Sequence, residues 1–161
     1  MKIPPNPFSR TFLWLLTPLL CCTFIPPAGA TEAGTSVVRR RLEQFYRDAE
    51  ASDLEAMMAL YAPDALILRN GQPPVVGRAA IRRWWQEIFA GSQLKARPEF
   101  DEVEQFGDAV VLRGRVRGTL MSKVGGELVP VDSWFLQIYR WREGAWEFWR
   151  GSSGTNPSPE K

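Results

Sequence analysis

Residues Ser52–Phe89 read SDLEAMMALYAPDALILRNGQPPVVGRAAIRRWWQEIF, which predicts a short helix, a strand, a proline-rich loop and a second helix in that order. Ser52 and Glu55 have the spacing of a capping box. In such a box the Ser52 side chain accepts from the Glu55 backbone amide, and the Glu55 side chain accepts from the Ser52 backbone amide. Pro63 is expected to end the first helix, because a residue that precedes proline avoids helical backbone. The buried side of that helix is expected to be Leu54, Met57, Met58 and Tyr61.

The second half of this stretch predicts a strand over residues 65–69, a loop over 71–74 and a helix that Gly77 opens and Gly91 ends. Glycine is the usual residue at a left-handed helix end, which is the role expected for Gly91. The apolar residues of the helix recur at intervals of three and four, so one face of it is buried. They are Ile81, Trp84, Trp85, Ile88 and Phe89.

Upstream of this stretch, another helix is expected to begin near Ser36. Residues 31–35 are polar and predict a mobile N-terminal segment, and residues 158–161 predict a polar tail. The domain is then expected to span residues 36–157, a length suited to one hydrophobic core. The apolar stripe of the helix that begins near Ser36 follows the spacing i, i+4, i+7 and i+11. It consists of Val38, Leu42, Phe45 and Ala49.

Residues 1–30 have the layout of a secretory signal peptide. Two basic residues precede an apolar run over residues 11–25, and small residues end the segment, with cleavage expected after Ala30. A membrane anchor is one alternative, but the run is shorter than the roughly 20 residues of a spanning helix. A lipid anchor at Cys21 or Cys22 is another, although the residue before either cysteine is larger than such a site requires. We expect a secreted or periplasmic protein with no stable membrane anchor after cleavage.

The mature chain is electrically neutral and lacks two chemically versatile residue types. Two of the 20 basic residues, Lys2 and Arg10, lie in the leader, which leaves 18 Lys and Arg against 18 Asp and Glu. A neutral chain gives no reason to expect nucleic acid as a partner. Both cysteines lie in the leader and the chain has no histidine, which removes the usual transition-metal ligands and the commonest general base. We therefore expect neither a metal site nor a cofactor.

The C-terminal half alternates apolar and polar residues, the pattern of strands with one dry and one wet face. A Gly-Asp pair at 107–108 predicts a two-residue hairpin turn, which pairs Glu102 with Arg113 on the wet face. The same register places Asp101 opposite Gly114 on the dry face, where Asp101 is a candidate site carboxylate. Alternatively, the strand begins after Asp101 and leaves it in solvent.

Residues 129–151 predict a second hairpin with its turn at 143–144, in which Gln137 pairs with Arg150. Both faces of this hairpin are largely apolar near the middle. One face must cover the helices, and the other then requires a cover of its own, which we expect to be a second subunit in a homodimer. The pattern leaves open which face covers the helices. One face carries Gln137, Tyr139, Trp141, Trp146 and Phe148, and the other carries Asp132, Trp134, Leu136, Ile138 and Trp149.

Four short motifs follow one another along the chain. They are Asp53-Leu54 with Leu60–Ala65, then Gly77–Ile81, then Phe106–Val110, then Gly144–Trp146. In this order they resemble the SnoaL-like and ketosteroid-isomerase-like branch of the nuclear transport factor 2-like superfamily, over about residues 36–157. The resemblance implies an α+β fold, in which a cone-shaped, curved antiparallel sheet wraps around three N-terminal helices and encloses a pocket. It also implies that subunits pair through the sheet.

Many proteins of this branch bind small, largely apolar molecules. The resemblance therefore implies a secreted or periplasmic binding module with a pocket for such a ligand. Its walls are expected to be Tyr61, Trp84, Trp85, Trp134 and Leu136.

The alternative implied by the resemblance is a small isomerase, cyclase or dehydratase that uses a buried carboxylate base. Asp132 is the first candidate, because burial beside Trp134 and Leu136 would raise its pKa. Asp101 is a second candidate carboxylate, and Tyr46 is a candidate hydroxyl donor. The lack of histidine favours the binding module.

Overall fold

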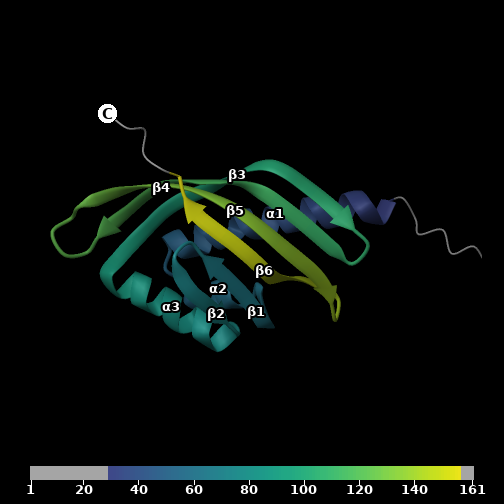
Figure 1. Ribbon diagram of the computed structural model, residues 1–161, viewed down its shortest axis with the longest axis horizontal. Helices are drawn as coiled ribbons and strands as arrows, with labels where there is room; N and C mark the ends of the chain where they lie inside the picture. Colours follow the sequence, from purple (N-terminus) through teal and green to yellow (C-terminus); the bar gives the residue numbers. More distant parts are fainter. Residues whose placement is uncertain (1–28, 157–161) are drawn as a thin grey trace, which may run out of the picture.

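The computed structural model describes residues 29–156, with side-chain detail from residue 34 onward. The expected signal peptide lies outside this range except for its last two residues, and the polar tail lies outside it as well. None of the described helices is long and apolar enough to cross a membrane. The elements, in chain order, are α1 Gly29–Glu50, α2 Leu54–Met58, β1 Tyr61–Arg69, β2 Gln72–Val76, α3 Arg78–Gly91, β3 Ser92–Phe106, β4 Ala109–Ser122, β5 Leu128–Arg142 and β6 Ala145–Thr155 (Figure 1).

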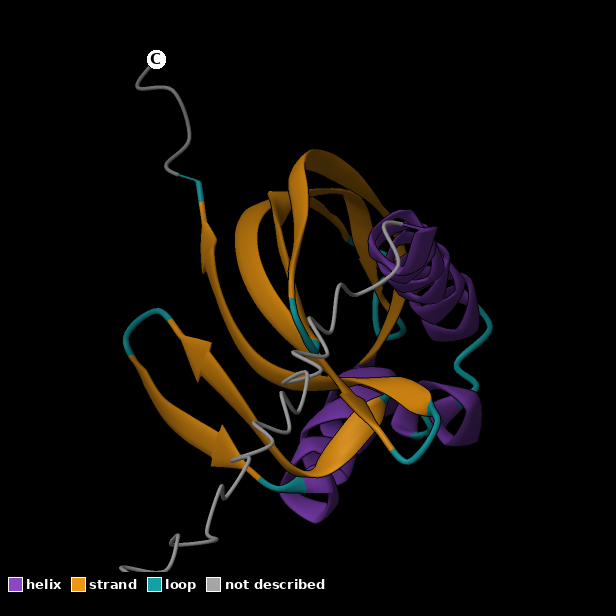
Figure 2. Ribbon diagram, turned by 90° about the vertical axis from the view of Figure 1, so that its right-hand side faces the viewer, coloured by secondary structure: helices purple, strands orange, loops and turns teal. Residues whose placement is uncertain are grey.

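The six strands form one sheet in the order β2-β1-β6-β5-β4-β3. The sheet curves strongly without closing, and the helices lie on its concave side (Figure 2). The expected α+β fold is confirmed. Four of the five strand pairs are antiparallel, and one pair, β1 and β6, runs parallel. A parallel pair needs a long connection, and here α3 and four strands lie between the two partners.

Helix α1 packs on the concave side through the expected apolar stripe. The helix begins at Gly29, before Ser36, so residues 31–35 are part of α1 rather than a separate segment. The four stripe residues are almost completely buried, which confirms the assignment of this face. They are Val38, Leu42, Phe45 and Ala49.

The N-terminal cap of α2 lies one residue later than expected. Asp53 Oδ1 accepts from the Ala56 amide at 3.1 Å, and Asp is as good a cap as Ser. Ser52 instead has a left-handed backbone, with φ of 55°, in the turn that separates α1 from α2. Glu55 forms an ion pair with Arg82 of α3 and does not complete a capping box. The expected box at Ser52 is therefore wrong.

Strand β1 begins at Tyr61, earlier than the expected residue 65, and Pro63 lies inside it. The expected loop over residues 71–74 is mostly strand: residues 72–76 form β2, and Gly71 lies in the turn before it. Pro73 and Pro74 are compatible with a strand here because β2 is at the edge of the sheet, where a missing N–H is tolerated.

Helix α3 follows Gly77 as expected, but it ends without a left-handed residue. Ser92 continues directly in an extended conformation into β3. The expected apolar face is confirmed: three residues are buried and two are packed at the edge of the core. These residues are Ile81, Trp85 and Phe89, then Trp84 and Ile88.

The β3–β4 hairpin pairs Glu102 with Arg113, as expected. A bulge at Asp101 places Phe100, and not Asp101, opposite Gly114. The bulge turns the Asp101 carboxylate into solvent, where it lies 3.0 Å from the Arg113 guanidinium. The expectation that Asp101 faces the dry side is therefore wrong.

The β5–β6 hairpin turns at residues 143–144. Both residues have positive φ, as a type I′ turn requires. A bulge in β6 at Trp149 then shifts the pairing by one residue. Gln137 consequently pairs with Gly151 rather than with Arg150.

Candidate ligand-binding site

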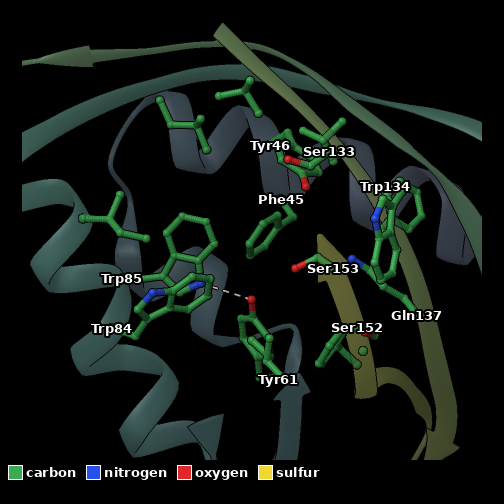
Figure 3. Close-up of a pocket in the computed structure, with 18 of the residues that line it drawn as sticks. Phe45, Tyr46, Tyr61, Trp84, Trp85, Ser133, Trp134, Gln137, Ser152 and Ser153 are labelled. Carbon is green, nitrogen blue, oxygen red and sulfur yellow. Dashed lines mark hydrogen bonds between the residues drawn. The ribbon is translucent and has the colours of Figure 1, made fainter. Parts of the chain in front are cut away.

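A cavity of about 290 Å³ lies between the concave face of the sheet and helices α1 and α3. Figure 3 shows its two sides. Helix α1 contributes Phe45 and Tyr46, and α3 contributes Trp84 and Trp85. Strand β1 adds Tyr61 at the bottom of the view. The helical side of the cavity is thus largely aromatic.

Tyr61 and Trp85 hold this aromatic wall together. Trp85 Nε1 donates to the Tyr61 hydroxyl at 3.2 Å, the dashed line in Figure 3. The Phe45 ring lies edge-on to both, with centroid distances of 5.9 Å to Tyr61 and 5.5 Å to Trp85. Phe148 of β6 packs against Tyr61 at 5.0 Å. Such edge-to-face contacts fix ring orientations, so the wall is preformed.

The sheet side of the cavity carries neutral hydrogen-bonding groups. Ser133 and Gln137 of β5 and Ser153 of β6 line it, and in Figure 3 the Gln137 side chain extends toward the helices. The Gln137 carbonyl oxygen accepts from the Tyr139 hydroxyl at 3.2 Å, which orients the amide. These groups lie opposite the aromatic wall.

The lining residues include no acid and no base. Burial raises the pKa of Tyr46 and of Tyr61 well above the ordinary value for tyrosine. Both hydroxyls therefore stay protonated at neutral pH and act as neutral hydrogen-bonding groups. Nor do the residues of the described range contain a group of three Asp or Glu side chains able to hold a metal ion.

Four of the five expected wall residues come together at this cavity. Tyr61, Trp84 and Trp85 lie on the helical side, and Trp134 borders the sheet side. Trp134 belongs to the outer face of β5, but its indole lies over Gly154, which has no side chain to block it. Leu136 is not part of the cavity: it is 43% exposed on the convex face.

Of the candidate catalytic residues, only Tyr46 lines the cavity. Asp132 is exposed on the convex face, because strand alternation places it opposite in direction to the buried Phe135. Its carboxylate accepts from the Asn156 side-chain amide at 2.6 Å. The expected burial of Asp132 is therefore wrong, and Asp101 is exposed in its bulge.

Sequence reasoning missed the polar half of the lining. Ser133 and Gln137 alternate with the buried Phe135 along β5, so the strand period contained a signal for them. The residues of β6 carried no such signal, because the bulge at Trp149 changes their register.

A larger hollow of about 610 Å³ lies elsewhere, between the start of α1 and the tips of the two hairpins. Its lining includes the charged residues Arg41 and Asp108 beside Trp141 and Trp146. Arg41 is already engaged, donating to the Trp146 carbonyl at 2.9 Å. This hollow does not have the aromatic wall of the first cavity.

Comparison with known families now identifies the fold. Residues 42–149 match the model of the SnoaL-like domain family. The chain belongs to this family. The sequence resemblance is thereby confirmed.

Solved structures similar to this SnoaL-like protein share its architecture. A ketosteroid isomerase-like protein from Erwinia carotovora atroseptica has a TM-score of 0.69 at 22% identity, over 76% of this chain and 97% of that chain. A conserved protein from Planctomyces limnophilus has a TM-score of 0.73 at 16% identity, and the match covers 78% of this chain and 98% of that chain. A nuclear transport factor 2-like protein with a cystatin-like fold, from Novosphingobium aromaticivorans, has a TM-score of 0.62 at 17% identity, and the match covers 80% of this chain and 86% of that chain. At these identities the likeness shows the fold alone. No curated protein matches the chain.

Proposed function

We propose that this SnoaL-like protein is a binding module for a small, largely apolar molecule held in the cavity between α1, α3 and the sheet. The observation that carries the proposal is the lining: aromatic rings on one side, neutral hydrogen-bonding groups on the other and no charged side chain. Apolar pockets with a few convergent polar groups are typical of small-molecule sites. Ser133, Gln137 and Ser153 would orient the ligand.

The size of the cavity sets the expected affinity. About 290 Å³ is at the lower end of the range for ligand pockets, which suits a molecule of about a dozen non-hydrogen atoms. Ligands of that size gain roughly 0.3–0.6 kcal/mol of binding free energy per non-hydrogen atom, which corresponds to dissociation constants from about 5 μM to about 2 mM.

We do not propose the isomerase alternative. A carboxylate base must lie within hydrogen-bond reach of the proton it removes. Asp132 and Asp101 are both exposed, and neither lines the cavity.

Calorimetric titration with 2-naphthamide, a flat neutral molecule, tests the binding proposal. Trp84→Ala should weaken binding at least fivefold by removing part of the aromatic wall. Trp141→Ala is the matched control, because Trp141 is 48% exposed and lines the other hollow. Its affinity should stay within twofold of wild type. No binding to the wild-type protein, or a loss caused by Trp141→Ala and not by Trp84→Ala, would contradict the proposal.

We further propose that the convex face pairs two subunits. Trp134 and Leu136 are 41% and 43% exposed on adjacent outward positions of β5, and apolar patches of this kind mark association sites. Light scattering should report twice the mass of one chain, and Leu136→Glu should convert the dimer to a monomer. A wild-type protein that stays monomeric at high concentration would refute the pairing.

Secretion with cleavage after Ala30 is likewise a proposal. Its support is the apolar run and the small residues in residues 1–30. Intact-mass measurement of the protein from the culture medium or periplasm should give a chain that begins at Thr31. A full-length chain retained in the cytoplasm would argue against it.

A further inference from the structure

The last residue of β1, Arg69, lies beside the cavity. It pairs with Ser153 of β6, a residue of the cavity lining. Its guanidinium carbon lies 4.9 Å from the ring centroid of Trp84, which also lines the cavity. Arg69 thus connects the aromatic wall of α3 with the polar side formed by β6.

Arg69 is half-buried and lacks a charged partner. No carboxylate of residues 34–156 forms an ion pair with it, whereas Arg78, Arg82 and Arg113 each have one. Its Nε is buried without a hydrogen-bond partner, and no other arginine nitrogen in this part of the chain is left so. Buried donors are nearly always satisfied, so an exception calls for a missing partner.

The Trp84 contact orients the Arg69 guanidinium but cannot satisfy its N–H groups. Stacking on an indole face uses the π surface of the guanidinium and leaves its in-plane donors available. Those donors form a planar fork that matches the two oxygens of a carboxylate. A carboxylate of a bound molecule would satisfy these donors and balance the charge of Arg69.

We propose that the ligand of the cavity is a small aromatic or similarly flat carboxylic acid, with its carboxylate bound by Arg69 and its apolar body between the aromatic wall and β5. This inference rests on the proposed binding function. The terminal guanidinium nitrogens would bind the carboxylate directly. The Nε–H, which neighbouring atoms now cover, would join after a small rotation of the side chain.

A matched pair of probes tests the charge preference: 2-naphthoate and its neutral amide, 2-naphthamide, titrated calorimetrically at pH 7. Wild-type protein should bind the carboxylate at least tenfold more tightly than the amide. Arg69→Gln should abolish that preference by lowering the affinity for the carboxylate to about that for the amide. Arg69→Lys should retain part of the preference for the carboxylate, because lysine keeps the positive charge but lacks the planar donors of the guanidinium.

Arg83→Gln is the control for charge alone, because Arg83 is exposed on α3 directly before Trp84. It should leave both affinities within twofold of wild type. If wild type binds the two probes equally, or if Arg69→Gln keeps the preference, the role of Arg69 is refuted while the cavity remains a binding site. If neither probe binds, both the inference and the proposed function fail.

Discussion

The indole N–H of Trp85 donates to the hydroxyl of Tyr61, with 3.2 Å between the two heavy atoms. Trp85 comes from α3 and Tyr61 from the start of β1, so this bond joins a helix to the sheet at the floor of the cavity (Figure 3). Both side chains are at least 93% buried. The bond therefore fixes two largely buried side chains of the aromatic wall relative to each other.

Tyr61→Phe is expected to lower the free energy of unfolding by about 1–3 kcal/mol, because it leaves the buried Trp85 N–H without an acceptor. Urea unfolding measures the change. Tyr46→Phe is the matched control, because no group of the described residues forms a hydrogen bond with the Tyr46 hydroxyl. Removing that hydroxyl should lower the free energy of unfolding by less than about 1 kcal/mol. Equal stabilities for Tyr61→Phe and wild type would contradict the role of the bond.

The tyrosines predict a delayed alkaline titration. The chain has three tyrosines, and burial raises the pKa of Tyr46, Tyr61 and Tyr139 above the ordinary value of 10.0. The folded protein then holds protons that the unfolded chain releases, so stability is constant up to about pH 10 and falls above it. Tyrosinate absorbance at about 295 nm should rise only with unfolding. A reversible rise in folded protein with a midpoint near 10 would show that a tyrosine is exposed.

Gly114 is expected to be irreplaceable at the curved part of the sheet. A Cβ at this position would lie 2.1 Å from the Glu99 carbonyl oxygen of β3, so the two strands would have to separate. Gly114→Ala should destabilise the protein by about 3 kcal/mol, the upper end of typical overpacking costs.

Gly91→Ala is the control for a glycine change without a clash, because nothing lies within 4 Å of a Cβ there. Its stability should stay within about 0.5 kcal/mol of wild type. A Gly114→Ala protein as stable as Gly91→Ala would contradict the close strand approach.

Asp132→Asn and Asp101→Asn are expected to leave ligand binding unchanged within twofold. Both carboxylates are exposed and neither lines the cavity, so surface substitutions of this kind should change stability by at most about 0.5 kcal/mol. The measurement is titration with 2-naphthamide and 2-naphthoate. A loss of more than tenfold in the Asp132 variant would restore that residue as part of the site.

The features that were predictable from the sequence are those with a local pattern. The stripe from Val38 to Ala49 and the face that contains Trp84 and Trp85 follow the helical period, and the turns at 107–108 and 143–144 follow from their residue types. Motif order then gave the family. The aromatic half of the cavity came with these helices.

The remaining features depend on contacts distant in sequence. The bulges at Asp101 and Trp149 reverse or shift the side-chain directions in their strands, and a one-residue change moves a side chain to the other face. Both faces of β5 are apolar near the middle, so the alternation could not decide whether Asp132 or Ser133 faces the core. The pairing of β5 with β4 and β6 in a sheet whose concave face covers the helices decided it, and it placed Asp132 on the convex face.

A crystal structure of the protein with 2-naphthamide bound at saturation is the most direct test of the proposed binding site. The ring system should occupy the cavity beside Trp84 and Tyr61, with the amide of the ligand toward Ser133 or Gln137. A ligand found in the hollow beside Trp141, or a cavity that stays empty while ligand binds elsewhere, would contradict the assignment.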